Sequence, residues 1–168
     1  MGPSGGNEAA IRVIGLGNDL LADDAFGLRV AGELRECLDA TVDVVASAAC
    51  GLHLLDEILG VRHLLVIDSV VTGDVRPGTL CIFHDQDVQT LAGSSPHASG
   101  LFDVLAGARR YGLPAPMDVT CITVEAQDCA AIGGAMHPAV AAAVGPAVER
   151  AVRIVREWQR CASEGRRA

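Results

Sequence analysis

The sequence is poor in aromatic residues and in positive charge. Its 168 residues include five aromatic ones: Phe26, Phe83, Phe102, Tyr111 and Trp158. That is too few for the stacking platform with which proteins bind single-stranded nucleic acid. Thirteen basic side chains against twenty-one acidic ones leave a formal charge of −8. Because nucleic-acid binders need a basic surface, this balance argues against a DNA or RNA partner.

Long apolar runs are also missing. No uninterrupted apolar stretch approaches the roughly 20 residues that a membrane-spanning helix needs. The first residues have neither the basic flank nor the apolar segment of a secretory signal. We therefore expect a cytoplasmic protein that makes no contact with a membrane.

Cysteine is present, but without the spacing of a metal or redox motif. The sequence has no C-x-x-C pair, and its six cysteines are scattered: Cys37, Cys50, Cys81, Cys121, Cys129 and Cys161. Several of them fall inside apolar runs, where cysteine behaves as a small hydrophobic residue. This pattern predicts free thiols in a reducing compartment.

The length fits one domain of common size. Half of the residues are apolar, enough to form a substantial core. No repeat, linker or low-complexity block divides the chain. We predict a flexible arm over residues 1–10, one domain over residues 11–161 and a flexible tail over residues 162–168.

Short apolar segments alternate with helical stripes along the chain. Strands are expected at 11–16, 41–46, 63–67, 79–83 and 118–125, with helices over 26–38, 51–59, 101–108 and 138–155. This alternation predicts a three-layer α/β/α sandwich around a mostly parallel, twisted, five-stranded sheet. The strand at 79–83 follows its predecessor too closely for a crossover helix, so we expect it to run antiparallel.

An acidic pair follows the first strand, at the sheet edge where such folds bind ligands. Asp23 and Asp24 stand at the entry to a predicted helix. The preceding G-x-G is not a dinucleotide fingerprint, because Leu20 occupies the position of its third glycine. One aspartate capping the helix and the other complementing its dipole would contribute about 1–2 kcal/mol together. This structural interpretation accounts for one aspartate at the helix entry better than for two adjacent ones.

Two further polar residues are expected at the same edge. Asp68 ends the most apolar strand, where it either accepts backbone hydrogen bonds or acts as a ligand or base. His97 stands in a loop just before a helix, a place where a lone histidine is ordinarily solvated. Taken with the acidic pair, they predict an oxygen and nitrogen site for a divalent ion such as nickel or zinc.

The order of these motifs resembles that of the maturation endopeptidases of [NiFe] hydrogenases. The family's opening signature, G-x-G-N-x-L-x-x-D-[DE]-x-x-G after a strand, is matched by Gly15, Gly17, Asn18, Leu20, Asp23, Asp24 and Gly27. Its strand-end acid falls on Asp68, and its Ser-Pro-His before a helix falls on residues 95–97. The resemblance extends over residues 11–157.

The resemblance implies an endopeptidase that removes a C-terminal extension from a hydrogenase large-subunit precursor after nickel insertion. Asp24, Asp68 and His97 would contact nickel, which the substrate supplies; zinc or cadmium could take its place in a crystal. Asp24 and Asp68 are the candidates for the catalytic base of an aspartyl-type protease, acting as a monomer. The residues leave open whether the metal or a carboxylate alone activates water. No serine or cysteine has an evident neighbouring base, which disfavours a covalent route.

Two segments depart from the family pattern. The family's Gly-Gly-Thr-x-Gly after the second strand is Ser-Ala-Ala-Cys-Gly here, at residues 47–51. Cys50 is expected to be a small buried residue rather than a soft nickel contact. The second segment is residues 124–127, which read Val-Glu-Ala-Gln where the family has Ile-Glu-Pro-Glu. Its Glu125 is expected to be either a secondary residue of the site or an exposed acid at a strand end.

Two other functions remain open at this point. A module that checks nickel in the precursor, or chaperones it, would bind without cutting. Peptidyl-tRNA hydrolases also open with a strand and Gly-Leu-Gly-Asn. Their next segment supplies a catalytic histidine, whereas Asp23 and Asp24 stand here, and the charge of −8 opposes a tRNA substrate.

Overall fold

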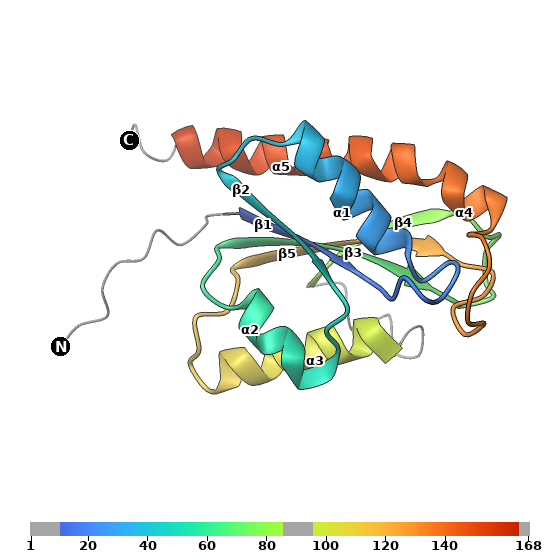
Figure 1. The fold of residues 1–168 in the computed structure, drawn as a ribbon. Coiled ribbons are helices and arrows are strands. Elements are labelled where there is room, and N and C mark those ends of the chain that lie inside the picture. The colour runs from blue at the N-terminus through green and yellow to red at the C-terminus, as the bar shows by residue number, and fades with distance from the viewer. Residues whose placement is uncertain (1–10, 86–95, 165–168) are drawn as a thin grey trace.

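The computed structural model describes residues 11–85 and 96–164, and the side chains of residues 96–99 are not among those described. Three layers are seen, with a twisted sheet between two layers of helices (Figure 1). The sheet has the order β2-β1-β3-β5-β4. Its strands are β1 (Ile11–Leu16), β2 (Val42–Ser47), β3 (His63–Val70), β4 (Leu80–His84) and β5 (Asp118–Glu125). The predicted three-layer fold is confirmed.

Strand directions follow the sequence prediction. β2, β1, β3 and β5 are parallel to their neighbours, and β4 alone is antiparallel. β4 pairs with β5 and not with β3, which precedes it in the chain. β3 therefore lies at the centre of the sheet, and the carboxyl ends of the four parallel strands share one edge.

Helices cover both faces of the sheet (Figure 1). The helical elements are α1 (Phe26–Cys37), the 3-10 turn η1 (Gly51–Leu54), α2 (Leu55–Ile58), α3 (Pro96–Arg110), α4 (Pro138–Ala142) and α5 (Val144–Glu164). α1, α4 and α5 pack on one face, while η1, α2 and α3 pack on the other. Across residues 11–85 and 96–164, no helix combines the length and the apolar character needed to cross a membrane.

The central strand supplies both cores. Leu65 and Ile67 of β3 pack under α1 and α5, whereas Leu64 and Val66 pack under α3. Successive side chains of a strand point to opposite faces, so a strand buried on both faces must be apolar throughout. β3 continues past its predicted end to Val70, because its last residues still pair with β5.

The C-terminal helical region differs from the prediction. The single long helix expected from the valine stripe is two helices, α4 and α5, separated at Ala143. Pro146 accounts for the break, since it lacks the N–H that would bond the carbonyl of Ala142. α5 continues to Glu164, so residues 162–164 are helical and not part of a tail. The predicted arm at 1–10 lies outside the described residues.

Glycines allow α1 to lie directly on the sheet. A Cβ added to Gly27 would meet the carbonyl oxygen of Leu16 and lie 2.5 Å from that of Ile67. A Cβ on Gly15 would meet the carbonyl oxygen of Gly27 in turn. The signature glycines therefore bring the start of α1 against β1 and β3. This close approach places Asp24, two residues before the first residue of α1, beside the end of β3.

We expect Gly27→Ala to lower the free energy of unfolding by about 3 kcal/mol, because the methyl group would separate α1 from the sheet. Gly32, also in α1, offers a matched control, since nothing lies within 4 Å of a Cβ added there. Gly32→Ala should stabilise the protein by about 0.5–1 kcal/mol through helix propensity. Thermal unfolding followed by circular dichroism compares the two, and equal melting temperatures would contradict the packing argument.

Candidate active site

Four buried acids lie at the carboxyl edge of the sheet. Asp23 and Asp24 come from the loop after β1, Asp68 from β3 and Glu125 from the end of β5, and none is more than 4% exposed. Burying a carboxylate is costly unless hydrogen bonds compensate it. The partners of each acid therefore show what that acid does.

Asp23 is a structural residue. Its Oδ2 accepts hydrogen bonds from the backbone N–H groups of Gln127 (2.8 Å) and Asp128 (3.1 Å), and its Oδ1 accepts one from His137 (2.6 Å). These bonds tie the segment after β5 to the loop after β1. The helix-cap interpretation is wrong, because the N-cap position of α1 is Ala25 and no side chain caps that helix.

Glu125 is likewise occupied by backbone and hydroxyl donors. Its Oε1 accepts from the N–H groups of Thr72 (2.8 Å) and Gly73 (2.7 Å), and its Oε2 accepts from the hydroxyl of Thr72 (2.7 Å). Glu125 thus holds the turn between β3 and β4. It is buried, so the expectation of an exposed acid is wrong, and its oxygens serve the turn rather than a ligand.

Asp24 and Asp68 accept fewer hydrogen bonds than the other two acids, and in both cases the donor is Ser69. The hydroxyl of Ser69 donates to Oδ1 of Asp24 (3.0 Å), and its backbone N–H donates to Oδ1 of Asp68 (2.8 Å). Within the described part of the chain, the Oδ2 atoms of both aspartates accept no hydrogen bond. A carboxylate has about four acceptor positions, so both residues keep capacity for a ligand or a water molecule.

The environment of Asp68 changes its protonation. Burial raises the pKa of Asp68 from 3.8 to about 8; the N–H of Ser69 opposes this shift, and the negative charge of Asp24 adds to it. Folding therefore favours the protonated form of Asp68 relative to the unfolded chain. Shifts of this size, caused by burial and a like charge, are common at functional sites.

Cys129 also lies beside this pair, through a contact with Ser69. Its Sγ lies 3.4 Å from Oγ of Ser69, and the residue is partly buried. Burial raises the pKa of the Cys129 thiol to about 11. Neither Ser69 nor Cys129 was predicted as a site residue. Ser69 could have been noticed as a polar residue next to Asp68 in an apolar strand, but nothing in the sequence pairs Cys129 with it.

His97 lies in the first turn of α3, and its side chain is outside the described residues. That end of α3 is at the same edge of the sheet, because a Cβ on Gly100 would lie 3.8 Å from the backbone nitrogen of Gly51, just after β2. Alternation along β3 points Asp68 toward the face that α3 covers. The structure thus brings Asp24 and Asp68 together and places the backbone of His97 at their edge. Among the described side chains, no three of His, Cys, Asp or Glu form a group suited to a metal ion.

Hydrogen bonds of Ser47 hold the segment at residues 47–51 in place. The hydroxyl of Ser47 donates to Oε1 of Glu57 (2.6 Å) and accepts from the N–H of Ala49 (3.0 Å). Gly51 has a φ of +54°, which favours glycine. Cys50 is exposed, so the expectation that it is a buried small residue is wrong.

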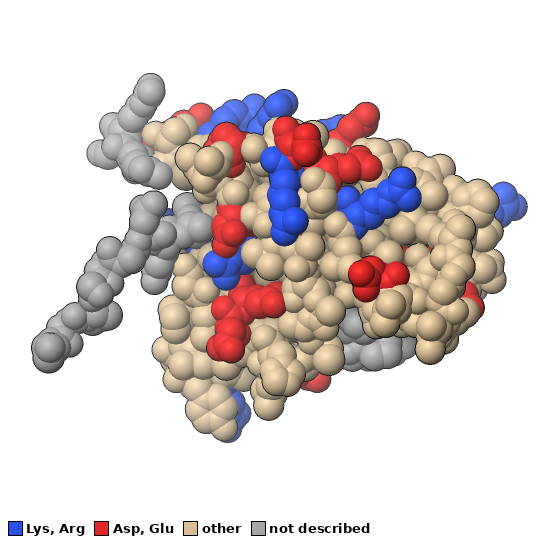
Figure 2. All heavy atoms as spheres, viewed as in Figure 1, with Lys and Arg blue, Asp and Glu red and all other residues tan. Residues whose placement is uncertain are grey.

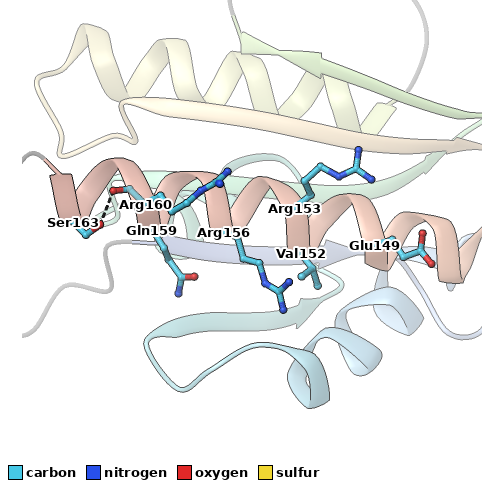
Figure 3. Close-up of a pocket in the computed structure, with 7 residues that line it drawn as sticks. All are labelled: Glu149, Val152, Arg153, Arg156, Gln159, Arg160 and Ser163. Carbon is cyan, nitrogen blue, oxygen red and sulfur yellow. Dashed lines mark hydrogen bonds between the residues drawn. The ribbon is translucent and has the colours of Figure 1, made fainter.

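A separate hollow lies along the C-terminal part of α5. It measures about 620 Å³ and is lined by Glu149, Val152, Arg153, Arg156, Gln159, Arg160 and Ser163 (Figure 3). This part of α5 is far from the carboxyl edge that holds Asp24 and Asp68 (Figure 1). On the face seen in Figure 2, acidic and basic side chains are interspersed rather than gathered by sign.

Sequence comparison relates the chain to hydrogenase maturation. The family model HycI, described as hydrogenase maturation protease, matches residues 28–154. The hydrogenase 2 maturation protease of Escherichia coli K12 is 34% identical over 151 residues, which are 88% of this chain and 91% of that protein. The hydrogenase expression/formation protein HupD of Rhodobacter capsulatus is 37% identical over 155 residues, covering 88% and 72% of the two chains.

Comparison with solved structures points to the same family as the sequence comparison. The solved structure of the hydrogenase maturating endopeptidase HybD from E. coli has a TM-score of 0.75 and 32% sequence identity to this chain. The match covers 88% of this chain and 92% of that one. HybD from Thermococcus kodakarensis, at 24% identity and a TM-score of 0.67, shares the fold and covers 86% and 97% of the two chains.

The raised pKa of Asp68 predicts a pH-dependent stability. The folded protein binds the Asp68 proton more tightly than the unfolded chain, so this stabilisation is complete below pH 3.8 and is lost as pH rises toward about 8. The slope is at most about 1.4 kcal/mol per pH unit. Asp68→Asn lacks this titration, so its stability relative to wild type should increase with pH. Urea unfolding with a chelator present tests this, and a constant difference would contradict it.

The bonds of Asp23 predict a local effect of its removal. In Asp23→Ala the backbone N–H groups of residues 127, 128 and 137 lose their acceptor, so their hydrogen exchange should become faster. A stability loss of about 3 kcal/mol is expected from the unpaired donors. Asp19→Ala is the matched control, because Asp19 is an exposed residue of the same loop. Equal exchange in both variants would show that Asp23 does not hold the segment.

Proposed function

This chain belongs to the hydrogenase maturation protease family, and on that premise we propose that it removes a C-terminal extension from a [NiFe] hydrogenase large-subunit precursor after nickel insertion. Family membership makes it a peptide hydrolase. One observation carries the proposed site: among four buried acids, only Asp24 and Asp68 keep an oxygen that no described residue bonds. These two acids stand at the edge where parallel α/β sheets bind their ligands.

Nickel in the precursor is the proposed recognition element. Asp24, Asp68 and His97 would hold it with two oxygen donors and one nitrogen donor, a set that suits nickel and also zinc or cadmium. The spare Oδ2 atoms of the two aspartates support this role, and so does the location of the first turn of α3. Because the metal arrives as part of the substrate, cleavage would follow only after nickel insertion.

The proposed reaction is hydrolysis of one peptide bond. Asp24 or Asp68 accepts a proton from the attacking water as the new C–O bond forms. The proton then passes to the leaving nitrogen as the C–N bond breaks. Nickel held by the same residues is able to polarise the carbonyl, and a route that relies on the carboxylates alone uses the same two side chains.

The proposed setting is the cytoplasm, with the protein acting as a monomer. All six cysteines are free in the structure, which fits a reducing compartment. A large-subunit precursor is the proposed macromolecular partner, and no nucleic acid or membrane is expected to take part.

The test is the intact mass of a large-subunit precursor after incubation with this protein. We expect loss of a C-terminal peptide from the nickel-loaded precursor and no loss from the nickel-free one. Asp24→Asn should lower the rate of cleavage by at least about 100-fold, since it removes a proton acceptor. His97→Ala should weaken binding of the nickel-loaded precursor.

Asp19→Asn serves as the control for the loss of one acid from the same exposed loop, and it should cut as wild type does. If the precursor binds but keeps its full mass, the alternative function, a module that checks nickel without cutting, is favoured. If Asp24→Asn cuts at the wild-type rate, the proposed catalytic site is wrong.

A further inference from the structure

We propose that Ser69 is a positioning residue that fixes Asp24 and Asp68 together, and that Cys129 fixes the direction of the Ser69 hydroxyl. The inference rests on the proposed function, because it assigns the two aspartates to the reaction. It adds Ser69 and Cys129, which belong neither to the signature motifs nor to the proposed nickel ligands.

Ser69 reaches both acids through different groups. It is 4% exposed, and its backbone N–H bonds Asp68 at 2.8 Å while its hydroxyl bonds Asp24 at 3.0 Å. Successive residues of β3 point to opposite faces, so Ser69 faces the side of α1 when Asp68 faces the side of α3. One residue thus connects an acid on one side of the sheet to an acid on the other.

The direction of the hydroxyl follows from counting hydrogens. A serine hydroxyl has a single hydrogen, and here it is donated to Asp24. The contact of 3.4 Å with Sγ of Cys129 must therefore be donated by the thiol to Oγ of Ser69. The pKa of the thiol, raised to about 11, keeps that donor protonated at neutral pH. The thiol of Cys129 thus donates a hydrogen bond to the hydroxyl of Ser69, and that hydroxyl donates one to Asp24.

This order has a consequence for the two carboxyl groups. Each has its Oδ1 held by Ser69, so each is left with its Oδ2 available. Without the hydroxyl, Asp24 loses the one hydrogen bond that it accepts from the described residues, and its carboxyl group is free to rotate. Partners that orient metal-binding side chains typically change metal affinity or activity by about 10–100-fold.

The experiment compares four variants of the full-length protein: Ser69→Ala, Cys129→Ala, the double variant and Thr120→Ala. Thr120→Ala is the control, because it removes a buried hydroxyl that contacts His84 instead of the acids. Two quantities are measured for each variant, namely kcat/KM on the nickel-loaded precursor and the affinity of the enzyme alone for Ni²⁺ by calorimetry. Melting temperatures are recorded alongside.

We expect Ser69→Ala to lower both kcat/KM and the Ni²⁺ affinity by about 10–100-fold, with the control unchanged. Cys129→Ala should have a smaller effect, because Ser69 can still donate to Asp24. Since Cys129 acts through Ser69, its removal should add nothing in the Ser69→Ala background. A purely structural role would instead lower the melting temperature and leave the Ni²⁺ affinity unchanged.

Wild-type kcat/KM and Ni²⁺ affinity in Ser69→Ala would overturn the inference. An additive effect in the double variant would overturn the role of Cys129. A wild-type protein that fails to shorten the precursor would instead contradict the proposed function, and the Ni²⁺ titrations would still decide whether Ser69 orients the two aspartates.

Discussion

Burial of carboxyl groups at one edge of the sheet is the constraint on which the rest of this structure depends. An unpaired buried carboxylate destabilises a fold, so donors must be provided wherever one occurs. Asp23 and Glu125 each accept three hydrogen bonds and in return hold the segments on either side of the site. Asp24 and Asp68, by contrast, each accept one hydrogen bond from the described residues. The two acids that hold neighbouring segments and the two proposed for the reaction thus lie at one edge but differ in the number of hydrogen-bond donors they meet.

The architecture could be predicted largely from local pattern. β1, β3 and β5 are apolar runs bounded by turn residues, and alternation with helical stripes leaves few topologies other than a parallel sheet covered on both faces. The break between α4 and α5 could also have been found, because Pro146 was visible in the sequence. The pairing of β4 with β5 could not, since the distance between β3 and β4 in the chain determines direction but not the neighbour.

The site was predicted only in part. The sequence places Asp24 and Asp68 at one edge because the carboxyl ends of parallel strands meet there. Nothing local shows that Asp23 has its oxygens filled, because its donors lie 104 to 114 residues further along the chain. Cys129 could not be predicted for the same reason, because it is 60 residues from Ser69 in the chain. Glu125 was misjudged because its donors belong to a turn that pattern analysis treats as solvent-exposed.

The bonds of Asp23 also bear on how the protein is made. They join a loop near the beginning of the chain to backbone groups at residues 127–137. During synthesis, the first strands and α1 leave the ribosome long before those groups exist, so an early fragment holds Asp23 without its donors. The site is completed only when the last quarter of the chain emerges. The hydrogen bonds of Asp23 can therefore form only after most of the chain has been synthesised.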